Sequence, residues 1–139
     1  MTPAELRIGN LVDYNGEIIE VDLIDSLRET INNPENDCES GISISDLKPI
    51  LLTEELLLKF GFEKYDWFDG YFIKYNNKHL MIQFYEPRKE ILIYFTKISK
   101  DKDGYKMNGR DYLFKLNKYY ANQLQNLYFA LTGEELIRK

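Results

Sequence analysis

The chain has 139 residues, of which 44% are hydrophobic and 29% charged, and this composition excludes an intrinsically disordered protein. The net charge of −5 argues against general binding to nucleic acid, since a phosphate backbone is bound by a positive surface. The single cysteine excludes an intramolecular disulfide, and no apolar run approaches the length of a membrane span or a signal core. We therefore expect a cytoplasmic protein without membrane association, folded as one compact domain or as one domain with a small appendage.

Residues 1–52 are predicted to form a small β unit. Asn15 and Gly16 lie between two apolar runs, and this dipeptide signals a hairpin because both central residues of a type I′ turn need positive φ. In residues 17–24 apolar and acidic side chains alternate, which is typical of a half-buried strand. A third short strand is expected at 41–45.

The polar stretch 25–41 is predicted to be a long acidic loop. The sequence places no other metal ligand near its carboxylates, so solvated side chains are favoured over a metal site. Cys38 lies among these acids, which disfavour a reactive thiolate. Three short strands with this excursion between the second and the third resemble an SH3-like curl. The alternative is a hairpin that joins a larger sheet.

Residues 53–61 indicate a short helix. Thr53 is the expected N-cap, two glutamates follow in the first turn, and Gly61 closes the helix. A turn further along the chain carries Trp67 and Phe68. If exposed, these two side chains would form a protein-binding hot spot, and if buried they would cover the end of a sheet.

The stretch Tyr71–Lys97 organises the rest of the chain. Apolar and aromatic residues recur there with a period of two in three runs, and turns with Asn76, Asn77 and Pro87 separate the runs. Connections this short allow only antiparallel pairing, so we predict a meander with one apolar face and one mixed face. A fourth strand is expected at Asp111–Leu116.

A C-terminal helix is predicted at 118–131, with Asn117 as its N-cap and Gly133 just past its end. Its apolar stripe is expected to pack on the meander. The opposite face is polar but uncharged, whereas solvated helix faces normally carry lysine and glutamate. The residues predicted to bind a protein there, or a second copy of the chain, are Asn122, Gln125 and Asn126.

Residues 97–110 form the most basic segment and are predicted to be a loop. Cations around an aromatic residue suit contact with nucleic acid, but neighbouring aspartates dilute the charge, so a solvated loop is favoured. A calcium loop is excluded because Arg110 occupies the position that requires a bidentate acid. The candidate nucleic-acid contacts are Lys100, Lys102, Tyr105, Lys106 and Arg110.

The sequence contains few residues that could form a catalytic site. The only histidine, His79, lies within a predicted strand, so neither a histidine metal site nor a Ser-His-Asp arrangement can be assembled. The glycines fall singly at turns and caps and form no phosphate-binding loop. We predict no catalytic, metal-binding or cofactor-binding residue and no cofactor, and the enzyme hypothesis is the least supported.

Two parts of the sequence resemble a known group of proteins. The first comprises Glu5–Val12 ahead of the Asn-Gly turn, together with residues 47–50 and 52–62, and the second is Gln123–Leu136. Together they are similar to a family of small uncharacterised proteins carried by bacteriophages and mobile elements of gut-type anaerobic bacteria. The resemblance implies an accessory protein that acts in the cytoplasm of a bacterial host cell, and accessory proteins of this size often bind a host protein.

These observations predict an α+β protein. A small β unit (1–52) precedes a short helix, an antiparallel meander and a C-terminal helix packed on the meander (53–139), in two domains or one continuous domain. The favoured function is a non-enzymatic protein-interaction factor that modulates or inhibits a host or defence protein, since an acidic, tyrosine-rich chain suits a basic protein face. The alternative is a nucleic-acid-binding accessory protein that uses the small β unit and the 97–110 segment.

Overall fold

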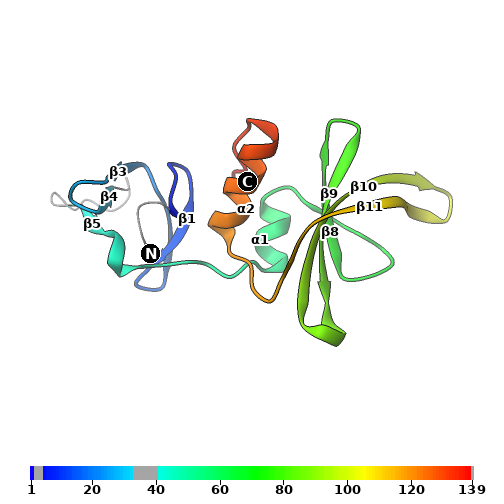
Figure 1. Ribbon diagram of the computed structural model, residues 1–139, viewed down its shortest axis with the longest axis horizontal. Coiled ribbons are helices and arrows are strands. Elements are labelled where there is room, and N and C mark those ends of the chain that lie inside the picture. Colours follow the sequence, from blue (N-terminus) through cyan, green and yellow to red (C-terminus); the bar gives the residue numbers. More distant parts are fainter. Residues whose placement is uncertain (2–4, 33–40, 139) are drawn as a thin grey trace. The chain divides into compact units, whose positions relative to one another are not determined.

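The structure is a computed structural model that describes residues 1, 5–32 and 41–138. Within these residues it is an α+β protein with three antiparallel sheets and two α-helices, which confirms the predicted fold class (Figure 1). Contacts divide the chain into two compact units. The first unit contains Met1–Leu52 and Tyr120–Ile137, and the second unit contains Thr53–Tyr119.

The first unit contains two three-stranded antiparallel sheets. Their strands are β1 Leu11–Tyr14, β2 Glu17–Glu20, β3 Leu23–Asp25, β4 Thr30–Asn32, β5 Ile42–Ser43 and β6 Leu47–Lys48. The strand orders are β2-β1-β6 and β3-β4-β5. The predicted hairpin is confirmed, because β1 pairs with β2 and the turn places Asn15 and Gly16 at φ values of 52° and 87°.

One segment of chain serves both of these sheets. The N–H of Val21 donates to the carbonyl oxygen of Asn10, whereas the N–H of Asp22 donates to the carbonyl oxygen of Asn32, each over 2.9 Å. The chain therefore passes from the first sheet to the second between Val21 and Asp22, where β2 leads into β3. A 3₁₀ turn, η2 (Ile44–Asp46), leads into β6. Neither sheet contains a strand of the meander, so the alternative in which the hairpin joins a larger sheet is wrong.

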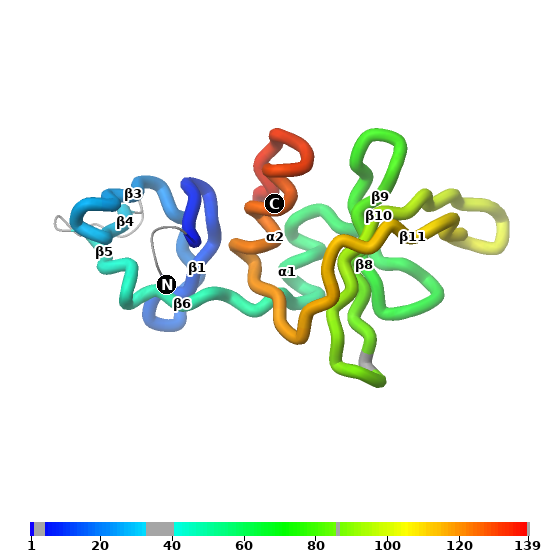
Figure 2. The backbone as a smooth tube through the Cα atoms, viewed as in Figure 1, coloured from blue at the N-terminus to red at the C-terminus, as the bar shows by residue number. Residues whose placement is uncertain are grey.

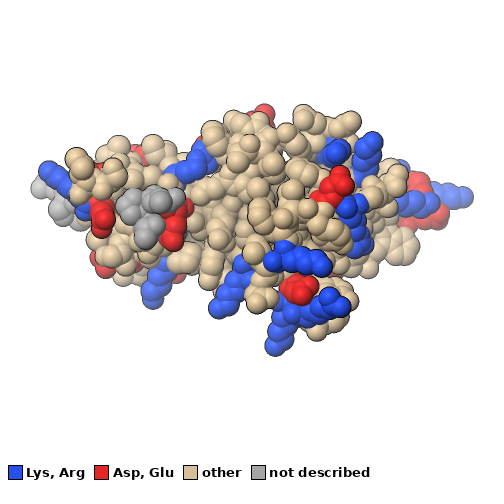
Figure 3. Space-filling view, viewed as in Figure 1, with Lys and Arg blue, Asp and Glu red and all other residues tan. Residues whose placement is uncertain are grey.

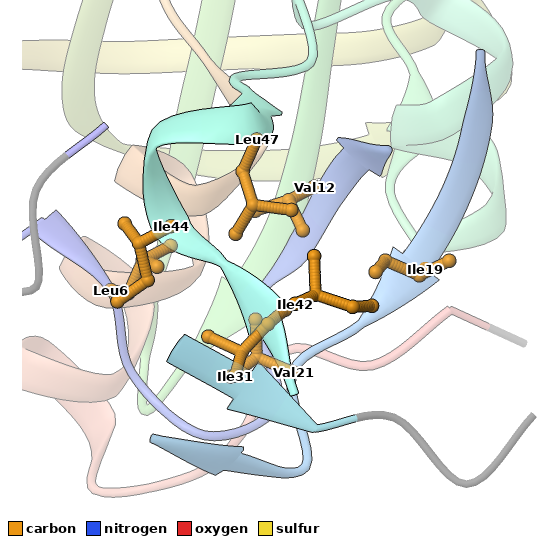
Figure 4. Packing of buried hydrophobic residues seen from close by; sticks show 8 residues of the cluster. All are labelled: Leu6, Val12, Ile19, Val21, Ile31, Ile42, Ile44 and Leu47. Carbon is orange, nitrogen blue, oxygen red and sulfur yellow. The ribbon is translucent and has the colours of Figure 1, made fainter. Parts of the chain in front are cut away.

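Apolar side chains from both sheets point toward one another and form one core (Figure 4). Its buried members are Leu6, Val12, Ile19, Val21, Ile31, Ile42, Ile44 and Leu47. Burying one such side chain stabilises a fold by roughly 1.5–3 kcal/mol, so this core offsets the shortness of the strands.

The prediction of an acidic loop over residues 25–41 is wrong for the first part of this range. Those residues form the turn and the second strand of the β3–β4 hairpin. The Asp25 carboxylate closes that turn by accepting two backbone N–H groups at 3.1 Å each. Ile31 is 1% exposed, so the core fixes a strand where the composition indicates a loop. Cys38 and its acidic neighbours, in residues 33–40, lie outside the described residues.

The second unit is built on one five-stranded antiparallel sheet (Figure 2). Its strands are β7 Glu63–Lys64, β8 Gly70–Tyr75, β9 Lys78–Tyr85, β10 Glu90–Asp101 and β11 Gly104–Leu116. Each strand lies beside the next one in the chain, so the predicted meander is confirmed. A 3₁₀ turn, η3 (Glu86–Arg88), connects β9 with β10.

The predicted short helix is α1 (Glu54–Lys59) in this unit. Its N-cap is confirmed, because Thr53 Oγ1 accepts the N–H of Leu56 at 3.2 Å. Gly61 follows the helix with φ of 95°, in the left-handed region that a glycine enters at little cost.

The loop predicted at 97–110 is wrong. The β10–β11 pair continues as a two-stranded ribbon past the end of β9, whose last pair joins His79 to Thr96. These residues form strands because apolar side chains alternate with the lysines. Tyr105 and Met107 lie on one face of β11 and pack against a buried aromatic cluster. The predicted fourth strand is the second half of β11.

The C-terminal helix α2 spans Ala121–Thr132. It begins later than predicted, because Tyr120 rather than Asn117 is its N-cap, and the side-chain oxygen of Gln123 accepts the Tyr120 N–H at 3.0 Å. Gly133 ends the helix with φ of 74°, as predicted.

The uncharged face of α2 faces into the first unit, and Gln125 is its most buried member, at 1% exposed. Its side-chain oxygen accepts the N–H of Leu11 at 2.9 Å. Its side-chain nitrogen donates to the carbonyl oxygens of Gly9 and Leu136 at 3.0 and 3.1 Å. One amide side chain thus joins β1 to both the helix and the segment after it.

Two asparagines continue this contact. Asn122, at 4% exposed, and Asn126 both donate to the carbonyl oxygen of Glu5, at 3.2 and 3.3 Å, and Asn126 also accepts from the Asn10 side chain at 2.9 Å. The prediction of an exposed binding face is therefore wrong for Asn122 and Gln125. By its contacts α2 belongs to the first unit, whereas the sequence analysis assigned it to residues 53–139.

Candidate functional site

Four candidate residues, two from each of the predicted sites, meet on one face of the second unit. The indole N–H of Trp67 donates to the carbonyl oxygen of Tyr105 at 2.5 Å. The guanidinium carbon of Arg110 lies 5.8 Å from the centre of the Phe68 ring. We call the surface formed by Trp67, Phe68, Tyr105, Arg110 and Tyr112 the aromatic–arginine surface.

A buried cluster supports this surface from below. Its members are Tyr65, Phe72, Met81, Leu92 and Tyr94. The ring centre of Tyr65 lies 4.7 Å from that of Phe68, and Phe72 lies 5.1 Å from Tyr105 at an interplanar angle of 74°. Gly70 is needed beneath Phe68, since a Cβ there would lie 2.7 Å from the ring.

A β-bulge turns Arg110 toward the surface. The pairing of β10 with β11 shifts between Phe95 and Lys97, so that Thr96 faces both Gly109 and Arg110. Gly109 has φ of 81°, and its carbonyl oxygen accepts the Thr96 hydroxyl at 2.5 Å. Without the extra residue, strict alternation would place Arg110 on the opposite face of the sheet.

Arg110 lies between aromatic side chains. Its guanidinium carbon is 5.4 Å from the centre of the Tyr94 ring, and its nitrogen donates to the Tyr112 hydroxyl at 3.3 Å, a hydrogen bond that raises the pKa of Arg110. Burial raises the pKa of Tyr94 to about 12, and the Tyr94 hydroxyl donates to Gln83 at 2.8 Å. At neutral pH the guanidinium is therefore charged and the Tyr94 phenol neutral.

Trp67 and Phe68 differ in exposure. Trp67 is 64% exposed, whereas Phe68 is half-buried and covers the end of the sheet. Tyr112, whose hydroxyl accepts a hydrogen bond from Arg110, is 49% exposed. Tyr112 is not among the residues predicted from sequence, although a tyrosine in an edge strand next to a basic segment is a usable signal.

The lysines predicted to bind nucleic acid lie on the ribbon, and one of them, Lys106, is paired with an acid. Lys106 Nζ is 2.6 Å from the carboxylate of Asp101, and this hydrogen bond lowers the Asp101 pKa. Lys100 Nζ lies 5.1 Å from the centre of the Tyr105 ring, and Lys102 lies in the turn. At the end of the ribbon, basic and acidic side chains lie side by side (Figure 3).

Within residues 1, 5–32 and 41–138, no three His, Cys, Asp or Glu side chains come together to hold a metal ion. Over the same residues, no helix has the length and apolarity to cross a membrane. No protein-family model, curated protein or solved structure matches the chain. The chemistry of the aromatic–arginine surface is therefore the basis for proposing a function.

His79 makes the stability of the ribbon depend on pH. Its Nδ1 accepts the N–H of Ile98 at 3.2 Å, which requires a neutral imidazole. Burial and then the charge of Lys74 lower the His79 pKa, against a smaller opposite effect of Glu63. Because the unfolded chain then takes up the proton first, stability is present above pH ~6.5 and is lost as the pH falls below it.

We expect the variant His79→Asn to lose less stability on acidification, since an amide oxygen keeps the acceptor but does not titrate. Urea unfolding between about pH 7 and pH 5 measures this, because most carboxylates titrate below that window. An equally steep pH dependence in the wild type and the variant would contradict the assignment.

Proposed function

We propose that this chain is a non-enzymatic protein-interaction factor that binds its partner through the aromatic–arginine surface. The carrying observation is the exposed Trp67 ring, which the hydrogen bond to Tyr105 holds in place next to Phe68, the ring that Arg110 faces. Tryptophan, tyrosine and arginine are the residue types that are enriched in binding hot spots. From the sequence resemblance, the partner is a host or defence protein in the cytoplasm of a bacterial cell, which the chain modulates or inhibits.

The edge strand β11 favours contact through side chains over addition of a strand. Its pairing with β10 is irregular at two places, between Ile93 and Tyr94 and between Phe95 and Lys97. Such bulges twist an edge away from the flat geometry that a further strand requires. The exposed rings and the guanidinium remain accessible to a folded partner.

Nucleic-acid binding is the second candidate, and the ribbon is the observation that favours it. A two-stranded ribbon fits a DNA major groove, and Lys97 and Lys106 alternate with the side chains that pack on the cluster, so they share its outer face. The ion pair of Lys106 with Asp101 reduces the charge available for phosphate contacts, which ranks this candidate second.

A tagged full-length chain, incubated with nuclease-treated bacterial lysate and analysed by mass spectrometry, tests the proposal. We expect one stoichiometric protein in the eluate and a Trp67→Ala variant that captures it at least about tenfold more weakly, since hot-spot truncations cost about 2 kcal/mol or more. The matched control is Leu27→Ala, because Leu27 is 97% exposed but lies in the first unit.

Equal capture by the wild type and Trp67→Ala would overturn the proposed surface. An eluate that is empty with nuclease, but contains protein and nucleic acid without it, would support the second candidate instead. In that case capture should weaken steeply with salt and on charge reversal at Lys102 and Lys106.

A further inference from the structure

Trp67 also lines an acidic hollow in the second unit. The residues that line it are Glu54, Lys64, Tyr65, Asp66, Trp67, Phe68 and Asp69. Lys64 lies 3.7 Å from Glu54 and compensates that carboxylate. Among the described residues, neither Asp66 nor Asp69 forms an ion pair, so two carboxylates that line the hollow carry uncompensated negative charge.

A buried group behind the hollow also lacks a partner. Tyr71 is fully buried, and its hydroxyl makes no hydrogen bond within the described residues, which is rare for a buried polar group. Burial, followed by the nearby carboxylates of Glu54 and Asp69, raises the pKa of Tyr71, so its hydroxyl stays protonated. The carboxylates of Glu54 and Asp69, which line the hollow, are the acceptors nearest to this proton.

We infer that this hollow receives one arginine side chain of the partner protein. The inference rests on the proposed function and specifies the partner's chemistry. A guanidinium stacks on an indole face and at the same time donates to carboxylates at its edge, a combination that a neutral side chain cannot reproduce. Lysine fits less well, because its ammonium is more strongly hydrated and cannot stack.

The single tryptophan provides a direct readout. The indole N–H of Trp67 gives one signal in a ¹⁵N–¹H spectrum of the labelled full-length chain, which is titrated with acetyl-Gly-Arg-Gly-amide. We expect a saturable shift with a dissociation constant on the order of 1 mM, as suits one cation on one ring. The isosteric citrulline peptide, which is neutral, should leave the signal unmoved. Equal responses to the two peptides, or no response to either, would overturn the inference.

The carboxylates are tested by the double variant Asp66→Asn/Asp69→Asn, which should weaken arginine-peptide binding at least about fivefold. The charge-matched control is Glu17→Gln/Asp22→Asn, which changes two exposed acids of the first unit. A control that weakens binding as much as the test variant would reduce the effect to net charge and overturn the inference.

The inference and the proposed function fail separately. If the natural partner is lost with Trp67→Ala but retained in full by Asp66→Asn/Asp69→Asn, the proposed surface stands and the arginine site falls. If the peptide binds but lysate capture is independent of Trp67, the site stands and the proposed partner surface falls.

Discussion

Replacing Gln125 by alanine is expected to lower the free energy of unfolding by about 3–5 kcal/mol, because several buried backbone groups lose their partner at once and each unsatisfied group costs about 1–3 kcal/mol. The groups are the N–H of Leu11 and the carbonyl oxygens of Gly9 and Leu136. Urea unfolding measures the loss. Amide exchange at Leu11 adds a local readout, since that N–H becomes free to exchange.

The matched control is Gln123→Ala, two residues earlier on the same helix, where an exposed side chain caps only the Tyr120 N–H. Its expected cost is about 1 kcal/mol. The variant Gln125→Met separates volume from hydrogen bonding, because methionine fills the space but cannot pair with the backbone groups. A methionine variant as stable as the wild type would show that packing, not the amide, holds the helix to β1.

This helix shows where reasoning from sequence fails. Periodicity identified a helix ending at Gly133, and the structure agrees. The assignment of its polar face depended on the rule that polar residues face water. That rule fails where a buried backbone group needs a hydrogen-bond partner, because a polar side chain is then buried to provide it. Gln125 is such a side chain, since it accepts the N–H of Leu11. The sequence of residues 118–131 alone does not indicate that the N–H of Leu11 requires a partner.

The candidate site shows a second limit. Composition identified Trp67 and Arg110 separately, because tryptophan and arginine stand out in their segments. That Arg110 lies over Phe68, the residue after Trp67, depends on the bulge at Gly109, which changes the face on which Arg110 lies. A glycine within an alternating run signals such a bulge, but only once the run is read as a strand. Reading residues 97–110 as a loop hid this signal.

The ribbon was misread because charge outweighed periodicity. Lysines and aspartates dominate the segment, yet Tyr105 and Met107 supply the apolar members of a period-two pattern. Their partners, Tyr65 and Phe72, lie far away in sequence. Long-range burial therefore decided a conformation that local composition could not.

Phe72→Ala tests that dependence and is expected to cost about 3–5 kcal/mol, the range for truncating a buried phenylalanine. Phe72 is 3% exposed and contacts the rings of Tyr65, His79 and Tyr105. Removing it leaves a cavity between the sheet and the ribbon. Urea unfolding measures the stability, and Trp67 fluorescence reports on the ribbon, because the indole is hydrogen-bonded to Tyr105.

Phe114→Ala is the matched control, since Phe114 lies in β11 of the same sheet but is 43% exposed. We expect that variant to lose less than about 1 kcal/mol and to keep the wild-type fluorescence. Phe72→Leu retains most of the volume without the ring contacts and should fall between the two. If Phe72→Ala leaves the Trp67 emission unchanged in the folded protein, the ribbon is held without the aromatic cluster, and the cluster stabilises the sheet alone.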